Sequence, residues 1–376
     1  MKLHYRVEGP DAAPWLVLLN SIGTSTAMWE PCVGPLAERY RVVRIDARGH
    51  GGSPPAPPQE RPQRLADLAA DVLEVLDGLG AGRVHLAGVS LGGMTAMWLA
   101  TRHPERIGRL ALICTSANMD AAQMWADRGR TVRAAGTLEV IADQVIARWT
   151  TPDLAARDPE VVARLRGMLT STDAESYAQC GEAIGAMDLV PDLGRIAAPT
   201  LVIGAVQDPA TPTGHQRVIA AAIPGAALEL IDNCAHIAPC EQPGAVTALL
   251  LAHLSGGQTT RRDVLGDAHV DRAAAATTDF TAPFQDFITR YAWGEVWTRP
   301  GLPRRDRSIA TLAAVVTLGA EEEIAMHVRA ALRNGLSTAE IAEVLLHTAL
   351  YAGLPRANRA YAIAQRVLTE EHGNLE

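Results

Sequence analysis

The stretch from Val84 to Met94 constrains the fold more than any other part of the sequence. Val84–Ala87 is a short apolar run, long enough for one buried strand. The motif G-x-S-x-G follows at Gly88–Gly92, and Gly93–Ala100 is a run of small and mostly apolar residues that favours a buried helix. Glycine and serine are common in turns, so the motif alone could arise by chance. Between a strand and a helix it predicts a nucleophile elbow, with Ser90 exposed at the start of the helix.

A second strand supplies the next element of such a site. Trp15–Leu19 is continuously apolar, as expected for a strand buried on both faces. The polar, glycine-containing loop Asn20–Thr24 follows it. Enzymes with a nucleophile elbow provide an oxyanion donor from this position. We expect the oxyanion hole to consist of the backbone N–H groups of Ile22 and Leu91. The alternative is an ordinary strand-to-helix turn.

Two later strands each end in a residue that could complete a catalytic triad. Asp208 follows the apolar strand at 200–204, and His236 follows the strand at 227–231. A serine hydroxyl is a weak nucleophile, so His236 would remove its proton and Asp208 would orient the imidazole. The alternatives are a helix-capping Asp208 and a surface His236. His50 competes for the role of base, although its glycine neighbours favour a structural turn.

The segment from about residue 115 to 188 lacks strand patterns and contains several helical stretches. Helices inserted between two sheet strands predict a cap over the active site. One arginine of this cap is expected to hold a substrate carboxylate, while most are solvated. Arg133 and Trp125 are our candidates for substrate contact, chosen from a set that also contains Arg128, Arg130, Arg148 and Trp149.

The composition changes near residue 255. Ser255–Thr260 is short, polar and glycine-rich, which predicts a flexible linker between a first domain at 1–254 and a second at 261–376. The second segment shows no strand alternation, only helical patterns, including a capping box at Ser337–Glu340. A chain of 376 residues is also longer than most single domains. We therefore expect an α/β domain followed by a separate all-α domain.

Charge and cysteine usage restrict the class of partner. The net charge of −8 argues against a nucleic-acid-binding face. The five cysteines show no framework spacing, which indicates free thiols in a reducing compartment. No apolar stretch is long enough to cross a bilayer, and the N-terminus lacks a signal region. These features predict a cytoplasmic protein that acts on small molecules, with no membrane partner.

The first segment resembles the α/β-hydrolase family, and the loops Asn20–Gly23 and Asp46–Gly51 look specifically like those of 3-oxoadipate enol-lactonases. The second segment resembles the 4-carboxymuconolactone decarboxylases. That resemblance rests on four motifs, at Trp293–Leu302, Arg305–Ser308, Glu323–Val328 and Tyr351–Pro355. The two families occur as a natural fusion in the protocatechuate branch of the β-ketoadipate pathway. The resemblance thus implies an α/β-hydrolase fold with a helical cap, followed by an all-α decarboxylase domain.

The resemblance also implies residues for the decarboxylation. Loss of CO₂ pushes electrons into a conjugated carbonyl of the substrate itself, so no cofactor is expected. His327 is the expected proton donor, Glu295 an orienting group, and Glu323 a partner of His327 one helical turn away. The pair Glu323 and His327 could also hold a metal, but two ligands are too few, and we expect none. The candidates for carboxylate binding are Arg304, Arg305 and Arg307.

The product enol-lactone would then be opened by Ser90. The relatives of the second segment assemble as rings, so a homo-oligomer formed through that segment is expected. The residues alone leave three alternative functions open: an esterase for another activated ester, a receptor on a hydrolase scaffold, and a helical segment that serves only oligomerisation.

Overall fold

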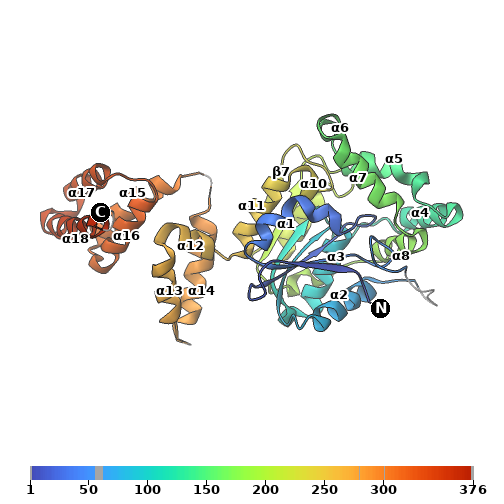
Figure 1. The fold of residues 1–376 in the computed structure, drawn as a ribbon, viewed down its shortest axis with the longest axis horizontal. Coiled ribbons are helices and arrows are strands. Elements are labelled where there is room, and N and C mark those ends of the chain that lie inside the picture. The colour runs from blue at the N-terminus through green and yellow to red at the C-terminus, as the bar shows by residue number, and fades with distance from the viewer. Residues whose placement is uncertain (1, 56–61, 279, 300, 374–376) are drawn as a thin grey trace. The chain divides into compact units, whose positions relative to one another are not determined.

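The computed structural model describes residues 2–55, 62–278, 280–299 and 301–373, and within these ranges it does not describe the side chains of residues 259, 286, 290, 295 and 372. The chain forms two compact units, Met1–Leu254 and Ser255–Glu376 (Figure 1).

The first unit is built on a seven-stranded sheet in the order β1-β3-β2-β4-β5-β6-β7, counted over its described residues. β1 is antiparallel to β3 and the other neighbours are parallel, so the carboxyl ends of the inner strands meet at one edge. The strands are β1 (Tyr5–Glu8), β2 (Trp15–Leu19), β3 (Arg41–Ile45), β4 (Val84–Val89), β5 (Ile107–Ile113), β6 (Thr200–Ala205) and β7 (Ala227–Ile231).

The inner strands are hydrophobic because helices cover the sheet on both faces. Leu16, Val17 and Leu18 of β2 are completely buried, as are Leu110 to Ile113 of β5. The helices around the sheet are α1 (Glu30–Ala37), α2 (Leu65–Gly78), α3 (Leu91–Arg102), α9 (Thr213–Ala222), α10 (Ala238–Glu241) and α11 (Pro243–Leu254), with 3₁₀ turns at Thr26–Trp29, Pro104–Arg106 and Val190–Arg195.

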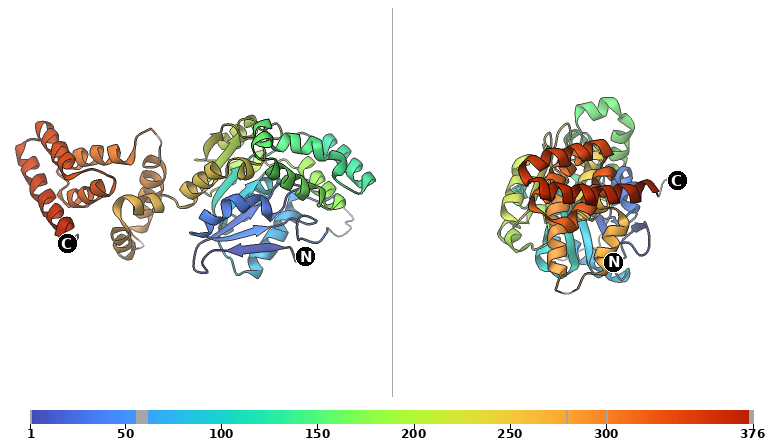
Figure 2. Two further views of the ribbon diagram at one scale, coloured as in Figure 1. Left: turned by 45° about the horizontal axis from the view of Figure 1, so that its top comes forward. Right: turned by 90° about the vertical axis from the view of Figure 1, so that its left-hand side faces the viewer.

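A helical insertion lies between β5 and β6, as the sequence predicts. It is drawn in green and gathers on one side of the first unit (Figures 1 and 2). A single β-bridge between Asn118 and Asp188 closes its base. Its helices are α4 (Ala122–Ala135), α5 (Glu139–Trp149), α6 (Pro152–Arg157), α7 (Pro159–Thr170) and α8 (Ala174–Gly185).

The second unit is helical over its described residues, which confirms the predicted fold class. Its last four helices enclose a core that includes Leu312, Val328 and Leu345. No helix in the described ranges of either unit combines the length and the apolar character that a bilayer-spanning segment needs. The elements of this unit are α12 (Gln258–Leu265), α13 (Asp267–Ala275), α14 (Ala282–Ile288), the π-helix η4 (Thr289–Val296), α15 (Arg304–Leu318), α16 (Glu321–Arg333), α17 (Thr338–Ala352) and α18 (Leu354–Gly373).

Only the first three residues of the predicted linker Ser255–Thr260 lie outside a helix. Helix α12 begins at Gln258, and Thr260 is buried. Gly257 has a φ of +86°, and a Cβ on it would lie 2.0 Å from the carbonyl oxygen of Thr289, so the turn is packed against η4. Tertiary packing of this kind cannot be read from polar composition, and the prediction was wrong for 258–260.

The first unit contains two half-buried histidines, His85 and His253, that should make it acid-sensitive. Burial, reinforced by Arg109, lowers the pKa of His253 to about 3 and that of His85 to about 4. Below the unfolded value of about 6.5, the unfolded chain binds protons that the folded chain does not. We therefore expect the free energy of unfolding to fall as the pH drops from about 6.5 towards 4, by about 1.4 kcal/mol per unit of pKa difference.

Urea unfolding at several pH values, followed by tryptophan fluorescence, measures this dependence. The matched variant is His253→Gln, whose amide can still donate to the Leu110 carbonyl that His253 Nε2 now contacts at 3.0 Å. The variant should lose less stability on acidification than the wild-type chain. An identical pH profile for both proteins would exclude His253 as a source of acid lability.

Candidate active site

Ser90 lies in a strained turn between β4 and α3. Its backbone has φ 52° and ψ −116°, a conformation that non-glycine residues rarely adopt. Two hydrogen bonds hold the turn: the Ser90 N–H donates to the Ile113 carbonyl at 3.0 Å, and Thr115 Oγ1 donates to the Ser90 carbonyl at 2.7 Å. A Cβ on Gly92 would lie 2.5 Å from the Leu19 carbonyl oxygen. The glycines of the motif therefore permit the close approach of helix and sheet.

Asp208 and His236 form a buried pair at the carboxyl ends of β6 and β7. His236 Nδ1 donates to Asp208 Oδ2 at 2.8 Å, and both side chains are almost completely buried. Burial acts to raise the pKa of Asp208, but the charge of His236 and the hydrogen bonds from His236 and Thr211 lower it below its usual value. Asp208 thus stays ionised and fixes the Nδ1–H tautomer, which leaves Nε2 as the proton-accepting nitrogen.

Ser90 and His236 line the same cavity, which has a volume of about 520 Å³ including its open mouth. Its other residues from the sheet domain are Ile22, Met94, Ala210 and Thr211. The cap contributes the remaining wall, mainly with apolar and aromatic side chains: Met119, Met124, Trp125, Arg128, Val145, Arg148, Trp149, Tyr177 and Ile184. A serine and a histidine therefore share a largely apolar cavity with two arginines.

The predicted oxyanion donors belong to the first turn of α3 and to the loop after β2. Leu91 is the first residue of α3, a position whose N–H has no partner within its own helix. Ile22 lies in the loop after β2 and lines the cavity. The Gly92 N–H donates to the Asn20 carbonyl at 3.0 Å, which ties this loop to the first turn of α3. The two N–H groups are thus carried by backbone segments that are hydrogen-bonded to each other.

His50 is not part of this cavity. Its Nδ1 donates to the Arg48 carbonyl at 2.8 Å, and burial lowers the pKa of its ring. Its neighbours Gly49 and Gly51 both have positive φ angles. His50 therefore belongs to a structural turn, and the structure offers His236 alone of the two as a partner for Ser90.

The structure does not bring Arg133 into the cavity. Arg133 Nε donates to Glu175 at 2.7 Å and its Nη1 to Glu182 at 2.5 Å, both on α8, and these contacts raise the pKa of the guanidinium. Arg133 is not among the residues that line the cavity, whereas Trp125 and Arg128 of the same helix are. Arg130 also stays outside, paired with Asp127.

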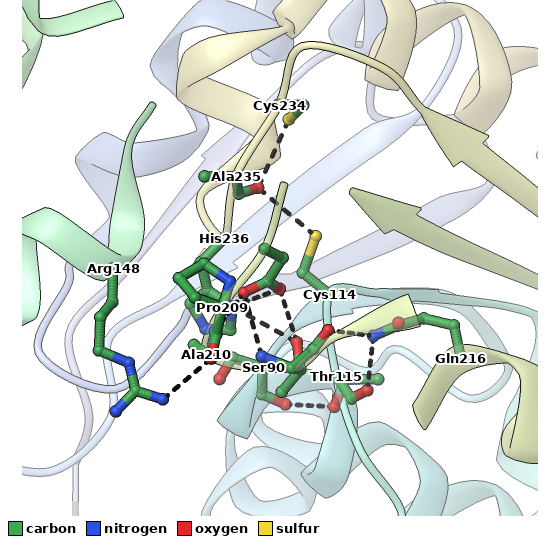
Figure 3. Close-up of polar contacts among 12 residues, drawn as sticks. Ser90, Cys114, Thr115, Arg148, Pro209, Ala210, Gln216, Cys234, Ala235 and His236 are labelled. Carbon is green, nitrogen blue, oxygen red and sulfur yellow. Dashed lines mark hydrogen bonds and ion pairs between the residues drawn. The ribbon is translucent and has the colours of Figure 1, made fainter. Parts of the chain in front are cut away.

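Two cap arginines occupy the place expected for Arg133. The Arg128 guanidinium lies 5.0 Å from the centre of the Trp125 ring. Arg148 Nη2 donates to the Pro209 carbonyl at 3.1 Å, next to Asp208 (Figure 3). Both arginines are half-buried, so each can keep its charge and still face a ligand in the cavity. Both arginines belong to the set of cap candidates named from the sequence, but Arg133 was predicted in their place.

In the second unit, His327 and Glu323 lie one turn apart on α16. His327 Nε2 is 3.9 Å from Glu323 Oε2, and 12% of the His327 side chain is exposed. Burial lowers the pKa of His327, Glu323 opposes this effect, and His269 adds to it. In the described part of the chain, no group of three histidine, cysteine, aspartate or glutamate side chains is placed to hold a metal ion.

The three arginines predicted to bind carboxylates each contact a different partner. Arg304 contacts Asp263 at 3.2 Å, and Arg305 forms an ion pair with Glu340. Arg307 Nη2 donates to the Arg299 carbonyl at 2.9 Å, and its buried Nε has no hydrogen-bond partner within the described residues. The side chain of Glu295 lies outside the described residues. Its backbone belongs to the π-helix η4, a rare element that often occurs at functional sites.

The two units match two different protein families. Residues 14–243 match the family described as alpha/beta hydrolase fold, and residues 282–366 match the carboxymuconolactone decarboxylase family. The first unit is 36% identical over 243 residues to 3-oxoadipate enol-lactonase 2 of Acinetobacter baylyi, an alignment that covers 65% of this chain and 89% of the relative.

Two further similarities support the same division. The second unit is 48% identical over 114 residues to 4-carboxymuconolactone decarboxylase of Acinetobacter baylyi, covering 30% of this chain and 85% of the relative. The crystal structure of the enol-lactonase from Burkholderia xenovorans superposes with a TM-score of 0.65 at 40% identity, over 67% of this chain and 96% of that chain. Each unit thus has nearly full-length relatives of its own.

Proposed function

Since the chain belongs to the α/β-hydrolase family and, in its second unit, to the carboxymuconolactone decarboxylase family, we propose that it is a bifunctional enzyme of protocatechuate catabolism. The second unit decarboxylates 4-carboxymuconolactone, and the first hydrolyses the resulting enol-lactone to 3-oxoadipate. One observation carries this proposal: the two units of one chain are similar to two enzymes whose names denote consecutive steps of the β-ketoadipate pathway.

In the first step, the carbon–carbon bond to the carboxylate breaks and CO₂ leaves. The electron pair passes into the conjugated lactone carbonyl, and carbon is then protonated to give the enol-lactone. The substrate serves as its own electron acceptor, so the protein has to bind carboxylates, stabilise the enolate oxygen and supply a proton. We assign the proton to His327, orientation to Glu295 and Glu323, and carboxylate binding to Arg304, Arg305 or Arg307.

In the second step, Ser90 Oγ attacks the lactone carbonyl while His236 Nε2 takes its proton. The backbone N–H groups of Ile22 and Leu91 stabilise the tetrahedral oxyanion. The ring opens, and the leaving enolate is protonated by His236 and becomes a ketone. Water then attacks the acyl enzyme, again with His236 as base, and releases 3-oxoadipate and free Ser90.

We propose that Arg128 and Arg148 bind the carboxylate of the enol-lactone. A charge-assisted hydrogen bond contributes about 1.5–3 kcal/mol, so Arg148→Met should lower kcat/KM for the enol-lactone about 10- to 100-fold, chiefly through KM. Arg128→Met should have an effect of the same kind. Steady-state kinetics with the enol-lactone and with a neutral activated ester measure this effect. The neutral ester has no carboxylate, so its kcat/KM should not depend on these arginines.

Arg133→Met is the matched control, since Arg133 lies on the same cap but is paired with Glu175 and Glu182. It should leave both substrates nearly unaffected. Loss of enol-lactone hydrolysis in Arg133→Met, with normal kinetics in the other two variants, would return the carboxylate site to Arg133.

We also propose that copies of the chain associate through the second unit. Several large apolar side chains of that unit are exposed by more than half, as is typical of protein interfaces. Those on α15, α17 and α18 are Leu318, Leu346, Leu350, Tyr351 and Leu354. The molar mass in solution, measured by light scattering, tests this assignment.

The full chain supplied with 4-carboxymuconolactone tests the proposed function directly. CO₂ and 3-oxoadipate should form in equal amounts, with the enol-lactone as a transient intermediate. If the chain hydrolyses the enol-lactone but releases no CO₂, the second unit serves only assembly. A chain that turns over other activated esters but not the enol-lactone would be a different esterase.

A further inference from the structure

A buried glutamine joins the two halves of the proposed triad. Gln216 lies on α9 and is completely buried. Its Nε2 donates two hydrogen bonds, to the Thr115 carbonyl at 2.9 Å and to the Thr211 carbonyl at 3.2 Å. Thr115 follows β5 and Thr211 follows β6, so one side-chain amide connects two loops at the catalytic edge of the sheet (Figure 3).

Each of these loops contacts one half of the site. Thr115 Oγ1 donates to the carbonyl of Ser90 at 2.7 Å. Thr211 Oγ1 donates at 2.7 Å to Asp208 Oδ2, the oxygen that also accepts from His236. Hydrogen bonds thus connect the backbone carbonyl of Ser90, through the residues Thr115, Gln216 and Thr211, to the pair of Asp208 and His236.

The other contacts along this path leave little freedom. A Cβ on Gly93 would lie 2.7 Å from the Thr115 side chain, so α3 is packed directly against Thr115. Gly204 of β6 leaves room for the glutamine, since a Cβ there would lie 3.3 Å from Gln216 Cγ. The loops on both sides of Gln216 therefore have their positions set by the same side chain.

Packing alone does not explain a glutamine at this position. Gln216 Oε1 is buried and has no hydrogen-bond partner among the described residues. A buried polar atom without a partner costs free energy that methionine, of similar size, would not incur. What methionine lacks is the pair of N–H donors directed at the two loops.

We propose that Gln216 is a positioning residue for ester hydrolysis, which sets the separation and orientation of Ser90 and His236 through Thr115 and Thr211. This inference rests on the proposed function of the first unit. Gln216 is not among the residues that line the substrate cavity, and its side-chain amide donates to Thr115 and Thr211 rather than to the triad. Misplacement of reacting groups by about 1 Å can cost about 100-fold in rate, so the role is open to kinetic measurement.

The test compares Gln216→Met with the wild-type full-length chain. We expect kcat for the enol-lactone to fall about 10- to 100-fold with little change in KM, because the cavity wall is unchanged. The rate at which a fluorophosphonate modifies Ser90 should fall by a similar factor, since this reaction needs an activated serine but no lactone binding. Decarboxylation by the second unit should stay unchanged and serves as the internal reference.

A second pair of variants separates positioning from stability. Thr115→Val removes the hydroxyl that contacts Ser90 and should reproduce the kcat defect, while Thr115→Ser keeps the hydroxyl and should restore most of the activity. Unfolding of all variants is measured in parallel. If Gln216→Met loses stability but still reacts with the fluorophosphonate and hydrolyses the enol-lactone at the wild-type rates, Gln216 is merely structural and the proposal fails. If the wild-type chain itself does not react with the fluorophosphonate, the proposed function of the first unit fails instead.

Discussion

Ser90→Ala should abolish hydrolysis of the enol-lactone and leave decarboxylation intact. The alanine side chain fits the strained turn but has no hydroxyl for His236 to activate. Loss of a serine nucleophile typically removes on the order of 10⁴ to 10⁶ in kcat. Because the decarboxylase residues lie in the other unit, the variant supplied with 4-carboxymuconolactone should release CO₂ at the wild-type rate and accumulate the enol-lactone. Chromatography of the reaction mixture against time measures both quantities.

Ser171→Ala is a suitable control, since Ser171 is an exposed serine of the cap. It should form 3-oxoadipate as the wild-type chain does. A reaction without enzyme measures any spontaneous hydrolysis of the enol-lactone, and this rate is subtracted. Formation of 3-oxoadipate by Ser90→Ala well above that rate would contradict the triad assignment.

His327→Ala should lower the rate of decarboxylation about 10²-fold or more, the usual contribution of a general acid. Hydrolysis of the enol-lactone should be unchanged. Burial holds the pKa of His327 below its usual range despite Glu323, so the protonated fraction increases as the pH falls. Decarboxylation by the wild-type chain should therefore become faster towards acidic pH, and this increase should be absent in the variant. Release of CO₂ at single-turnover conditions, followed across the pH range, measures both effects.

His347→Ala provides the matched control, because His347 is an exposed histidine on α17 whose ring contacts that of Tyr351 at a tilt of 57°. Near-normal CO₂ release by a folded His327→Ala variant would remove His327 from the mechanism. Inhibition of the wild-type enzyme by a chelator, reversed by added metal, would instead favour a metal site at Glu323 and His327.

The catalytic edge of the sheet was largely predictable from sequence. Parallel strands place their carboxyl ends at one edge, so residues that directly follow apolar runs are expected to meet there. Ser90, Asp208 and His236 each follow such a run, and the structure places them together in this way. This prediction uses only the positions of the three residues after apolar runs and needs no knowledge of side-chain packing.

The residues that depend on packing between elements could not be predicted. Arg128 and Arg133 lie on the same helix, and only the contact of α4 with α8 determines that one faces the cavity and the other Glu175. Likewise, Gln216 has no local motif, because its two acceptors follow different strands. The helix that begins at Gln258 was missed because two of its polar residues, Thr260 and Arg261, are buried rather than solvated.

The distribution of thiols gives the molecule an internal reporter of unfolding. All five cysteines precede residue 241, and in the structure four are buried and one is partly buried. Burial raises the pKa of Cys32 to about 11 and that of Cys180 to about 12, so the reactive thiolate is scarce while the first unit is folded. The second unit contains no cysteine. Alkylation followed by mass spectrometry would therefore record the opening of the hydrolase unit alone, whatever the state of the second unit.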